Sequence, residues 1–310
     1  MLEQRNKRLL IILLVLIAAT VATAYWVSPE DTSFVVDKNL FRKVDLKTVD
    51  RIQLASSSDS IDLTFKDGRW SVNGKYPADR AMIEVLFATL QQAEPRRPVA
   101  ASLKDSIATA LEKTGVKVDL IADQLREETF YAGGNGGKSQ AFFKLEGDDV
   151  PYIMIIPGYR VYASGIFELK EAQWRDKHVF PFNWRSFKSL QATFPDKRND
   201  FRIAMQDDFF GVEGVEKTDT TKLNEYMDSI LPLTANEYVK ADTLPQAFAG
   251  QEPIVAITVE DIAGRQYSLK IYPLSTGKQF AAEVNGTEWA IFDAARILPV
   301  LRPKGFFADK

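Results

Sequence analysis

The stretch SIDLTFKDGRWSVNGKYPADRAMIEVLFATL, residues 60–90, predicts a strand, a turn, a second strand and a helix in succession. Its first seven residues alternate polar and apolar side chains, which is the period of two of a strand buried on one face. Asp67-Gly68 is typical of a hairpin turn, and Asn73-Gly74 ends the second strand. This unit is the basis of the predicted fold.

The helix of this unit has its own signals. Asp79 offers a side-chain oxygen to the free amides of a helix start. Apolar residues then recur at helical spacing, and we expect them to form the buried stripe: Met82, Val85, Leu86, Leu90 and Ala93.

The same pattern returns later in the chain. Val72, Gly74 and Asp79 correspond to Val212, Gly214 and Asp219 at an offset of 140, and Val116 and Val118 correspond to Val255 and Ile257 at 139. The helix stripe corresponds at an offset of 141 to a second stripe, which comprises Leu223, Tyr226, Met227 and Leu231. Agreement in pattern with little residue identity indicates an internal duplication.

These patterns predict an α+β fold class, with an N-terminal transmembrane helix followed by two duplicated lobes of mostly antiparallel sheet with packed helices. Each lobe is expected to end on a helical stretch, Ile166 to Arg175 in the first and Asp293 to Leu301 in the second. The predicted domains are 1–27 for a cytoplasmic tip and transmembrane anchor, 28–48 for a linker, 49–178 for the first lobe and 179–310 for the second.

Composition excludes several classes of protein. The 310 residues are 45% hydrophobic, so a disordered or collagen-like chain is excluded. There is no cysteine, which excludes disulfides, thiolate metal sites and a catalytic thiol. A net charge of −3 without a basic stripe argues against nucleic acid as a partner.

The N-terminus predicts a membrane anchor. Residues 9–27 carry no charge and extend about 28 Å as a helix, roughly one bilayer core. Basic residues precede this segment and interfacial aromatic residues end it: Arg5, Lys7, Arg8, Tyr25 and Trp26. We expect a single-pass protein of the bacterial inner membrane, with a cytoplasmic N-terminus and a periplasmic or otherwise extracytoplasmic body.

A cleaved secretory signal is the alternative interpretation of this segment. Ala22, Thr23 and Ala24 form a small-x-small site after an apolar stretch. The length of the apolar stretch favours the anchor, and both interpretations place the body outside the cytoplasm.

The motifs that might carry chemistry are weak. Residues 133–137, GGNGG, precede a strand rather than a helix, so a hairpin connection is favoured over a phosphate loop. His178 is the only histidine, and surface packing is favoured over general base catalysis. Asn285-Gly286-Thr287 fits a glycosylation acceptor and fits a turn equally well.

Acidic pairs are a further candidate for chemistry, since two carboxylates can serve a hydrolase. Nothing in the sequence brings two of these pairs together, and most flank strand ends where solvated charge is expected. They are Glu127-Glu128, Asp148-Asp149, Asp207-Asp208 and Glu260-Asp261. We therefore predict no catalytic residue, no metal site and no cofactor.

Residues 173–187, QWRDKHVFPFNWRSF, are the densest run of aromatic and arginine side chains. Such residues dominate interface hot spots, and they also pack hinges between lobes, which the position between the two repeats favours. The candidate interaction or inter-lobe residues are Trp174, Arg175, Phe180, Phe182, Trp184 and Arg185.

Several short motifs follow one another in a recognisable order: Val49-Asp50-Arg51-Ile52, Ile61 to Phe65, Gly68 to Val72, Pro77 to Arg80, and Trp174 to Lys177. With the N-terminal anchor they resemble a bacterial domain-of-unknown-function family, DUF4340, over roughly residues 30–300. That family is often encoded beside ABC transporters and auxiliary subunits of the gliding-motility type. The resemblance implies an envelope accessory role and carries over no catalytic residue.

Three functions are compared. The favoured one is a membrane-anchored extracytoplasmic interaction protein, with the inner membrane and an ABC permease or auxiliary subunit as partners. The alternative is a two-lobed periplasmic module that holds a small ligand or glycan between its lobes. An enzyme is the least favoured, because no two titratable groups are nominated for one cleft.

Overall fold

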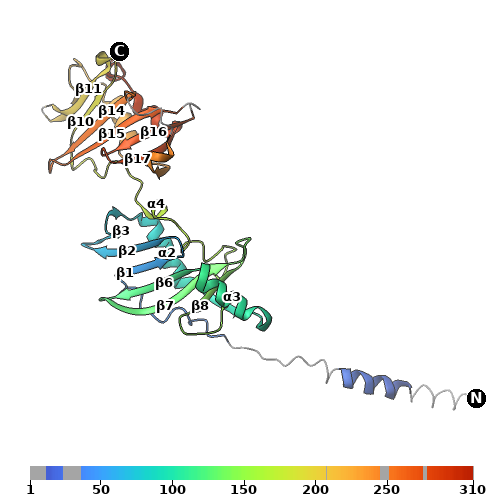
Figure 1. Cartoon of the computed structure of the whole chain (residues 1–310). Coiled ribbons are helices and arrows are strands. Elements are labelled where there is room, and N and C mark those ends of the chain that lie inside the picture. The colour runs from blue at the N-terminus through green and yellow to red at the C-terminus, as the bar shows by residue number, and fades with distance from the viewer. Residues whose placement is uncertain (1–11, 24–35, 207, 245–250, 275–277, 310) are drawn as a thin grey trace, which may run out of the picture.

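The computed structural model describes residues 12–23, 36–206, 208–244, 251–274 and 278–309. Their fold is α+β: two antiparallel sheets of nine and eight strands form two lobes that meet near a short helix, α4 (Figure 1). We call them lobe one and lobe two in chain order. The predicted fold class is confirmed at this level.

Lobe one contains the nine-stranded sheet. Its order is β4-β3-β2-β1-β6-β7-β8-β9-β5. The strands are β1 Arg51–Ala55, β2 Ser60–Lys66, β3 Arg69–Val72, β4 Tyr76–Pro77, β5 Glu94–Pro98, β6 Val116–Ala122, β7 Leu125–Gly134, β8 Ala141–Leu145 and β9 Tyr152–Ile155. The helices are α2 Arg80–Gln92, α3 Ala101–Thr114 and α4 Glu171–Trp174.

Lobe two contains the eight-stranded sheet. Its order is β12-β11-β10-β14-β15-β16-β17-β13. The strands are β10 Phe187–Thr193, β11 Phe201–Gln206, β12 Phe209–Val212, β13 Glu237–Val239, β14 Val255–Asp261, β15 Gln266–Pro273, β16 Gln279–Val284 and β17 Glu288–Asp293. The helices are α5 Thr220–Ile230 and α6 Ala294–Ile297, with 3-10 turns η1 Lys197–Asn199, η2 Ala241–Thr243, η4 Leu298–Leu301 and η5 Lys304–Phe307.

The two sheets repeat one another strand for strand. When β4 is left out, the two sheets have the same spatial order of eight strands. Each has a hairpin (β3-β2 or β12-β11), then the first strand of the lobe (β1 or β10), then a meander of four strands (β6 to β9 or β14 to β17) and last an edge strand (β5 or β13). The register repeats as well. Leu63 pairs with Val72 and Phe65 with Trp70 in lobe one, while Ile203 pairs with Val212 and Met205 with Phe210 in lobe two. These strand pairs keep the predicted offset of 140.

The hairpin turns follow from their residues. Asp67 and Gly68 have φ of 52° and 79°, the positive values of a type I′ turn that suits the twist of the two strands. Asn285 and Gly286, with φ of 51° and 72°, make a turn with similar positive φ values between β16 and β17. The turn interpretation of both dipeptides is confirmed.

The helices α2 and α5 begin alike. Asp79 and Asp219 are the N-caps, and each carboxylate accepts backbone N–H bonds from the second and third residues that follow it. The buried residues of the two helices therefore align at an offset of 140: Ile83, Leu86 and Leu90 with Leu223, Tyr226 and Ile230.

The predicted stripe of α2 is right at Leu86, Leu90 and Ala93 and wrong at Met82 and Val85, and its offset of 141 is wrong. Val85 is 45% exposed and Met82 is partly exposed, whereas Ile83 is buried. Apolar residues lie on both faces of this helix, so the apolar pattern alone did not determine which face packs on the sheet. Alignment of the two N-caps, Asp79 and Asp219, gives the offset of the buried residues correctly.

Each lobe is closed by residues that return to the start of its helix. In lobe one, the carbonyl of Trp174 accepts the Asp79 N–H at 2.7 Å, and Ala78 forms a β-bridge with Arg175. In lobe two, the carbonyl of Phe307 accepts the Asp219 N–H at 2.9 Å, and Thr218 forms a β-bridge with Ala308. Both Trp174 and Phe307 are fully buried in their cores.

Two elements differ from the sequence prediction. The expected helix from Ile166 to Arg175 is helical only at Glu171–Trp174, and the residues before it form turns. The helix α3 was not predicted, because only Leu111 of its fourteen residues is buried and it has little apolar stripe. The helical end of lobe two, α6 followed by η4, is confirmed.

The predicted anchor is described only in part. Residues 12–23 are helical, and their side chains are exposed. Among the described residues no helix has both the length and the apolar character needed to cross a bilayer. The other residues of the predicted span lie outside the described residues, as do the predicted interface residues Arg5, Lys7, Arg8, Tyr25 and Trp26.

Candidate interaction site

The aromatic run at 173–187 lies where the two lobes meet, and most of its aromatic side chains are buried. Trp174 belongs to the core of lobe one, and Phe180 and Phe182 belong to the core of lobe two. Trp184 is 37% exposed, and Arg185 is exposed. The buried aromatic residues of the run therefore belong to the core of one lobe or the other, and Trp184 and Arg185 are the candidate residues that reach the surface.

Backbone bonds fix this run to both lobes. The Asp176 N–H donates to the carbonyl of Pro77 in lobe one at 2.8 Å. Three residues later, the Val179 N–H donates to the carbonyl of Leu233 in lobe two at 2.9 Å. The connection between the lobes is therefore held by one backbone hydrogen bond to each lobe.

Arg175 joins the lobes through its side chain. The guanidinium carbon lies 3.5 Å from the ring centre of Tyr76 in lobe one and 4.0 Å from that of Tyr238 in lobe two. One guanidinium nitrogen lies 2.6 Å from a carboxylate oxygen of Glu288 in lobe two. A planar cation between two rings, held by a carboxylate, combines cation–π attraction with a charged hydrogen bond. We call this group the Arg175 clamp.

The electrostatics of the Arg175 clamp follow from its burial. Arg175 is 7% exposed, and its Nε is buried without a hydrogen-bond partner. Burial raises the pKa of Tyr238 to about 12, although the nearby Arg175 charge acts in the opposite direction. The phenol thus stays neutral at physiological pH. Sequence reasoning missed all three partners of Arg175, because Glu288 is 113 residues away and carries no local signal.

A cleft lies beside the Arg175 clamp, with residues of both lobes in its walls. Its volume is about 490 Å³, and its walls include Tyr76 and Lys170 from lobe one and Lys240, Glu288 and Trp289 from lobe two. No ion pair joins Lys170 or Lys240 to a residue within the described ranges. The cleft walls therefore hold two lysines outside these ion pairs, together with the carboxylates of Asp59 and Glu171.

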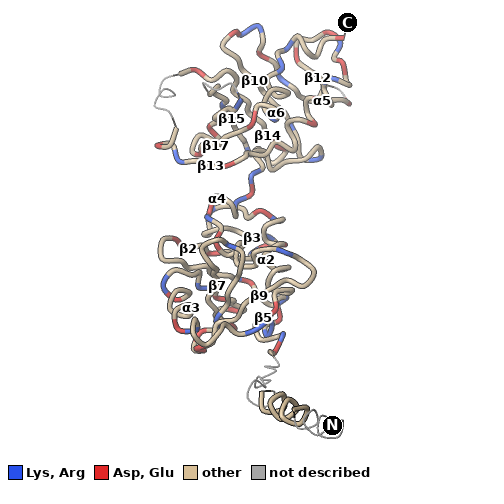
Figure 2. Tube along the Cα trace, turned by 90° about the vertical axis from the view of Figure 1, so that its right-hand side faces the viewer, with Lys and Arg blue, Asp and Glu red and all other residues tan. Residues whose placement is uncertain are grey.

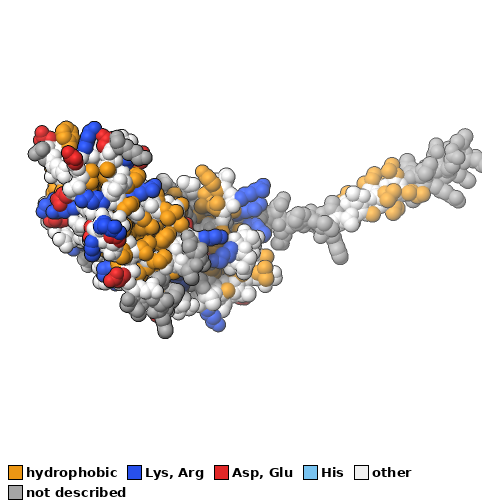
Figure 3. Space-filling model, turned by 90° about the horizontal axis from the view of Figure 1, so that it is seen from above, with side chains coloured by type: hydrophobic (Ala, Val, Ile, Leu, Met, Phe, Trp, Pro, Cys, Tyr) orange, Lys and Arg blue, Asp and Glu red, His pale blue; other side chains and the backbone are white. Residues whose placement is uncertain are grey.

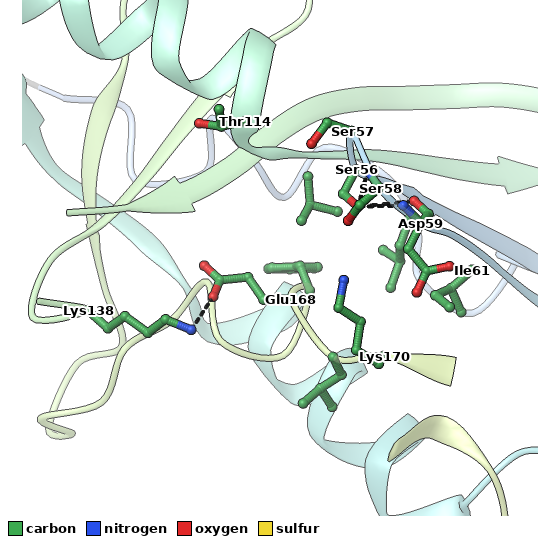
Figure 4. Close-up of a pocket in the computed structure, with 13 residues that line it drawn as sticks. Ser56, Ser57, Ser58, Asp59, Ile61, Thr114, Lys138, Glu168 and Lys170 are labelled. Carbon is green, nitrogen blue, oxygen red and sulfur yellow. Dashed lines mark hydrogen bonds and ion pairs between the residues drawn. The ribbon is translucent and has the colours of Figure 1, made fainter. Parts of the chain in front are cut away.

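A second, polar pocket of about 320 Å³ lies in lobe one (Figure 4). The turn Ser56 to Asp59 forms one wall, and Glu168 and Lys138 form another. Lys138 Nζ lies 2.8 Å from Glu168, and the Lys170 side chain extends into the space between Glu168 and Asp59 (Figure 4). These residues are far apart in the sequence, and no sequence pattern predicted that they meet.

A third pocket of about 520 Å³ lies against the glycine run and α3, with Leu103, Ile107 and Phe142 among its walls. The predicted hairpin connection between β7 and β8 is confirmed. Gly134 is required here, since a Cβ at this position would collide with the ring of Tyr162. The Tyr162 hydroxyl bonds to Glu168, and burial together with that carboxylate raises the pKa of Tyr162.

The main exposed apolar surface of lobe two lies at one end of its sheet. Trp184 precedes β10, Met205 is the last residue but one of β11 and Phe209 begins β12, so the antiparallel order brings them to the same end. Met205 is 56% exposed and Phe209 is 78% exposed. The ring of Trp184 packs 5.8 Å from that of Phe210, the strand partner of Met205, so Trp184 and Met205 lie on one face of the sheet and Phe209 lies on the other. We call Trp184 and Met205, together with Ile262 at the neighbouring turn, the lobe-two patch.

Ile262 belongs to this end because its N–H donates to the carbonyl of Ser186 at 2.9 Å, and it is 69% exposed. In the view from above, hydrophobic side chains gather on one side of the body and charged side chains border them (Figure 3). Apolar patches of this kind mark interaction surfaces in soluble domains.

The remaining motifs comprise exposed and buried groups. Nδ1 of His178 lies 2.6 Å from the neighbouring Asp176 carboxylate, and the imidazole is exposed. Of the acidic pairs, Asp207 lies outside the described residues and Asp261 is held by Arg265 in a turn. Within the described ranges no group of three His, Asp or Glu residues is placed to hold a metal ion. Burial raises the pKa of Glu128, whose Oε2 is buried without a partner.

Comparison with known families gives one match. The family model described as Domain of unknown function (DUF4340) matches residues 70–250, more than half of the chain and parts of both lobes. No curated protein matches the chain, and neither does any solved structure.

Proposed function

The chain belongs to the DUF4340 family, and on this premise we propose that it is a membrane-anchored extracytoplasmic interaction protein. In this role it assists an envelope assembly such as an ABC-type transporter by contact, without a catalytic step or a cofactor. The partner is a permease or an auxiliary subunit of that assembly. Nucleic acid is not a partner in this proposal, since acidic and basic side chains alternate over both lobes (Figure 2).

The lobe-two patch is the observation that carries this proposal. It combines Trp184 and Met205 on one face of the sheet, and aromatic and Met side chains are enriched in protein interfaces. Arg185 follows Trp184 and is exposed. Tryptophan and arginine are the residue types that most often dominate binding energy. An exposed group of this kind at the end of a sheet supports contact with another protein.

The membrane anchor of the proposal is residues 9–27, with the N-terminus in the cytoplasm and the lobes outside it. The uncharged sequence of this segment and the helix at residues 12–23 support it. An anchor has a mechanical purpose in this role, because confinement to the membrane raises the concentration of the lobes near a membrane partner.

The test is crosslinking in cells, followed by affinity purification of the full-length protein and mass spectrometry. We expect an ABC permease or an auxiliary subunit to be recovered with the unmodified protein. The variant Met205→Ser should lower that recovery about tenfold, because an interface hot spot contributes about 2 kcal/mol or more. Recovery of the protein alone, or equal recovery with Met205→Ser, would contradict the proposal.

A matched control comes from lobe one. Phe65 occupies the position in β2 that Met205 occupies in β11, and it is 44% exposed. The variant Phe65→Ser makes the same kind of change on the other lobe and should leave recovery unchanged.

A second candidate function is a two-lobed binding module, which the cleft beside the Arg175 clamp supports. Clefts at domain interfaces are common ligand sites, and about 490 Å³ suffices for a small ligand. In that case ligand binding should protect the amides of β13, at the edge of the cleft, from hydrogen exchange. Unchanged exchange there in the presence of envelope extracts would count against it.

A further inference from the structure

An apolar groove follows the outer face of helix α2 in lobe one. Met82, Val85 and Ala88 recur at a spacing of three residues along the helix and form one wall. The loop after β9 forms the other wall, with Tyr159 and Val161 among its residues. The space has a volume of about 550 Å³, and none of the described residues in its walls carries a charge. We call it the α2 groove.

The corresponding face of α5 in lobe two is charged. At the offset of 140 residues, the three apolar residues of α2 correspond to Lys222, Glu225 and Asp228. Glu225 and Asp228 are exposed, as is usual on the solvated face of a helix. Packing on the sheet therefore does not require apolar side chains at these positions. A face that is apolar in only one of two repeats indicates a contact that this repeat alone makes.

The rim of the α2 groove is exposed. Val85 is 45% exposed, Val161 is 55% exposed and Tyr159 is 66% exposed. The Tyr159 N–H donates to the carbonyl of Ile156 at 3.0 Å, and Gly158 has φ of 81°, so a tight turn fixes the backbone of the loop. The groove thus presents apolar side chains to its surroundings from a helix and a fixed turn.

The less exposed polar side chains in the walls are already paired. The Thr89 hydroxyl donates to the carbonyl of Val85 at 2.8 Å, and the Tyr162 hydroxyl bonds to Glu168. A peptide strand in the groove would leave backbone N–H and C=O groups without partners on this side, which costs free energy. The walls therefore favour an occupant without hydrogen-bonding groups, and a hydrocarbon chain is such an occupant.

A basic residue lies between the exposed Tyr159 and Val161. Arg160 is exposed, and it has no ion pair with a residue in the described ranges. Tyrosine is enriched at membrane–water interfaces, and the planar guanidinium of arginine suits phosphate groups. The three residues together combine an interfacial ring, a phosphate-binding cation and an aliphatic side chain.

The position of the groove in the chain points to the same partner. Arg42 lies in the segment that enters lobe one, and its guanidinium donates to the carbonyls of Gln92 and Ala93 at 3.1 and 3.0 Å. Gln92, the last residue of α2, also lines the groove. From the end of the predicted anchor at residue 27 to Arg42, the chain spans at most about 50 Å when fully extended. The anchor therefore keeps the α2 groove close to the bilayer.

We propose that the α2 groove contacts the lipid bilayer in which the chain is anchored, with Tyr159 and Val161 at the level of the headgroups and acyl chains against α2. Arg160 binds lipid phosphate at the same edge. The inference rests on the proposed function for the anchor, and it adds a lipid contact of lobe one to the protein contact of the lobe-two patch. Lobe one is then oriented on the membrane rather than freely tethered to it.

The test uses the full-length protein in liposomes of phosphatidylethanolamine and phosphatidylglycerol, which contain no other protein. The chain has no cysteine, so Val85→Cys, Val161→Cys and Glu225→Cys each carry a single spin label. Collision rates with oxygen and with a water-soluble nickel chelate report the surroundings of each label. Because oxygen concentrates in lipid and the chelate stays in water, the oxygen-to-nickel ratio should be at least about threefold higher at residues 85 and 161 than at residue 225.

A charge in the groove should release lobe one from the bilayer. Val85→Glu copies Glu225 of lobe two, and it should lower the ratio at residue 161 to within about twofold of that at residue 225, since a carboxylate in lipid costs more than a tenfold change in the bound population. Leu298→Glu makes the same kind of change at a residue of lobe two that is 56% exposed, and it should leave the ratio at residue 161 unchanged. An unchanged melting temperature of Val85→Glu excludes misfolding as the cause.

Equal ratios at residues 85, 161 and 225, in protein that floats with the liposomes, would overturn the inference and leave the anchor intact. Failure of the protein to float with the liposomes would contradict the anchor and this contact together. Shielding of residue 161 only after a partner protein is added would also overturn the inference and would make the groove a protein interface. Met205→Ser separates the two contacts, because it should reduce recovery of the membrane partner and leave residue 161 shielded by lipid.

Discussion

Lobe one and lobe two have the same framework, and they differ in what they present at equivalent positions. Both close on a large aromatic side chain, Trp174 or Phe307, which is fully buried. The next residue is Arg175 in lobe one and Ala308 in lobe two. Arg175 reaches the other lobe, whereas an alanine ends at its Cβ. One substitution in the repeat thus converts a lobe closure into a connection between lobes.

The hairpins differ in a related way. In lobe one Trp70 packs between Phe65 and Phe87, with ring centres 5.5 Å away in each case. In lobe two the equivalent Phe210 packs on Trp184 and Phe187 from the segment that enters the lobe. Helix α2 therefore supplies the cover in lobe one, and the inter-lobe segment supplies it in lobe two. The two sheets thus have the same strand register, although different segments of the chain pack on their hairpins.

Removal of the aromatic residue that closes a lobe should have the largest effect on stability. Trp174→Ala should destabilise lobe one by about 3–5 kcal/mol, because it opens a cavity in a packed core. Trp174→Phe, which copies lobe two, should cost clearly less. Calorimetry of the full chain measures both, and a loss below about 1 kcal/mol for Trp174→Ala would contradict the equivalence of Trp174 and Phe307.

Removal of the clamp should have a smaller effect on stability and a distinct effect on geometry. Arg175→Ala, which copies Ala308, should cost about 2 kcal/mol, since it removes two cation–π contacts and a charged hydrogen bond. Spin labels on exposed residues of the two lobes should then give a broader distance distribution. Glu288→Gln keeps the stacked guanidinium and should broaden it less. An unchanged distribution in Arg175→Ala would show that the backbone bonds alone hold the lobes.

The two helix caps should respond equally. Asp79→Ala and Asp219→Ala each remove a side-chain acceptor from two backbone amides and should each cost about 1 kcal/mol. Urea unfolding of each variant measures the cost. A difference greater than about 1 kcal/mol between them would show that the repeats do not use their caps in the same way.

The smallest effect concerns Glu128, which pairs with Leu120 where lobe two pairs Tyr267 with Val259. Burial raises the pKa of Glu128, so the folded state binds more protons than the unfolded state. Stability at this site is therefore lost as the pH rises above the ordinary glutamate pKa of about 4.3. Glu128→Gln should be more stable than the unmodified protein at pH 7, by about 1 kcal/mol or less.

The comparison between the two forms isolates this group. Their melting temperatures should converge as the pH falls to about 4. A constant difference from pH 4 to pH 7 would show that the gain comes from packing rather than from proton binding.

The strands were predictable because their signals are local. Alternation in residues 60–72 and the dipeptides Asp67-Gly68 and Asn285-Gly286 specify strands and turns without help from the rest of the chain. The face of α2 was predictable only in part, since Leu86 and Leu90 are buried as expected, whereas Met82 and Ile83 are both apolar and only packing on the sheet chooses between them. The spacing of the two N-caps, Asp79 and Asp219, is 140, which is the offset at which the buried residues of the two helices align.

The candidate sites were predictable only in part. The run 173–187 was located from its composition, and its position between repeats indicated inter-lobe packing. The polar pocket of lobe one was not, because Ser58, Lys138 and Lys170 come from three separate connections and Thr114 from the end of α3, which only the folded chain brings together. Met205 and Phe209 lie in ordinary strands, and the sequence alone does not show which strand residues the fold leaves exposed.

The closure of each lobe by its final residues has a consequence for biosynthesis. Lobe one lacks its central core side chain and the partner of the Asp79 amide until Trp174 has left the ribosome. From then on it is complete, whereas lobe two waits for Phe307. The repeats can therefore fold one after the other as they are synthesised, and the first is finished before the strands of the second exist to compete for pairing.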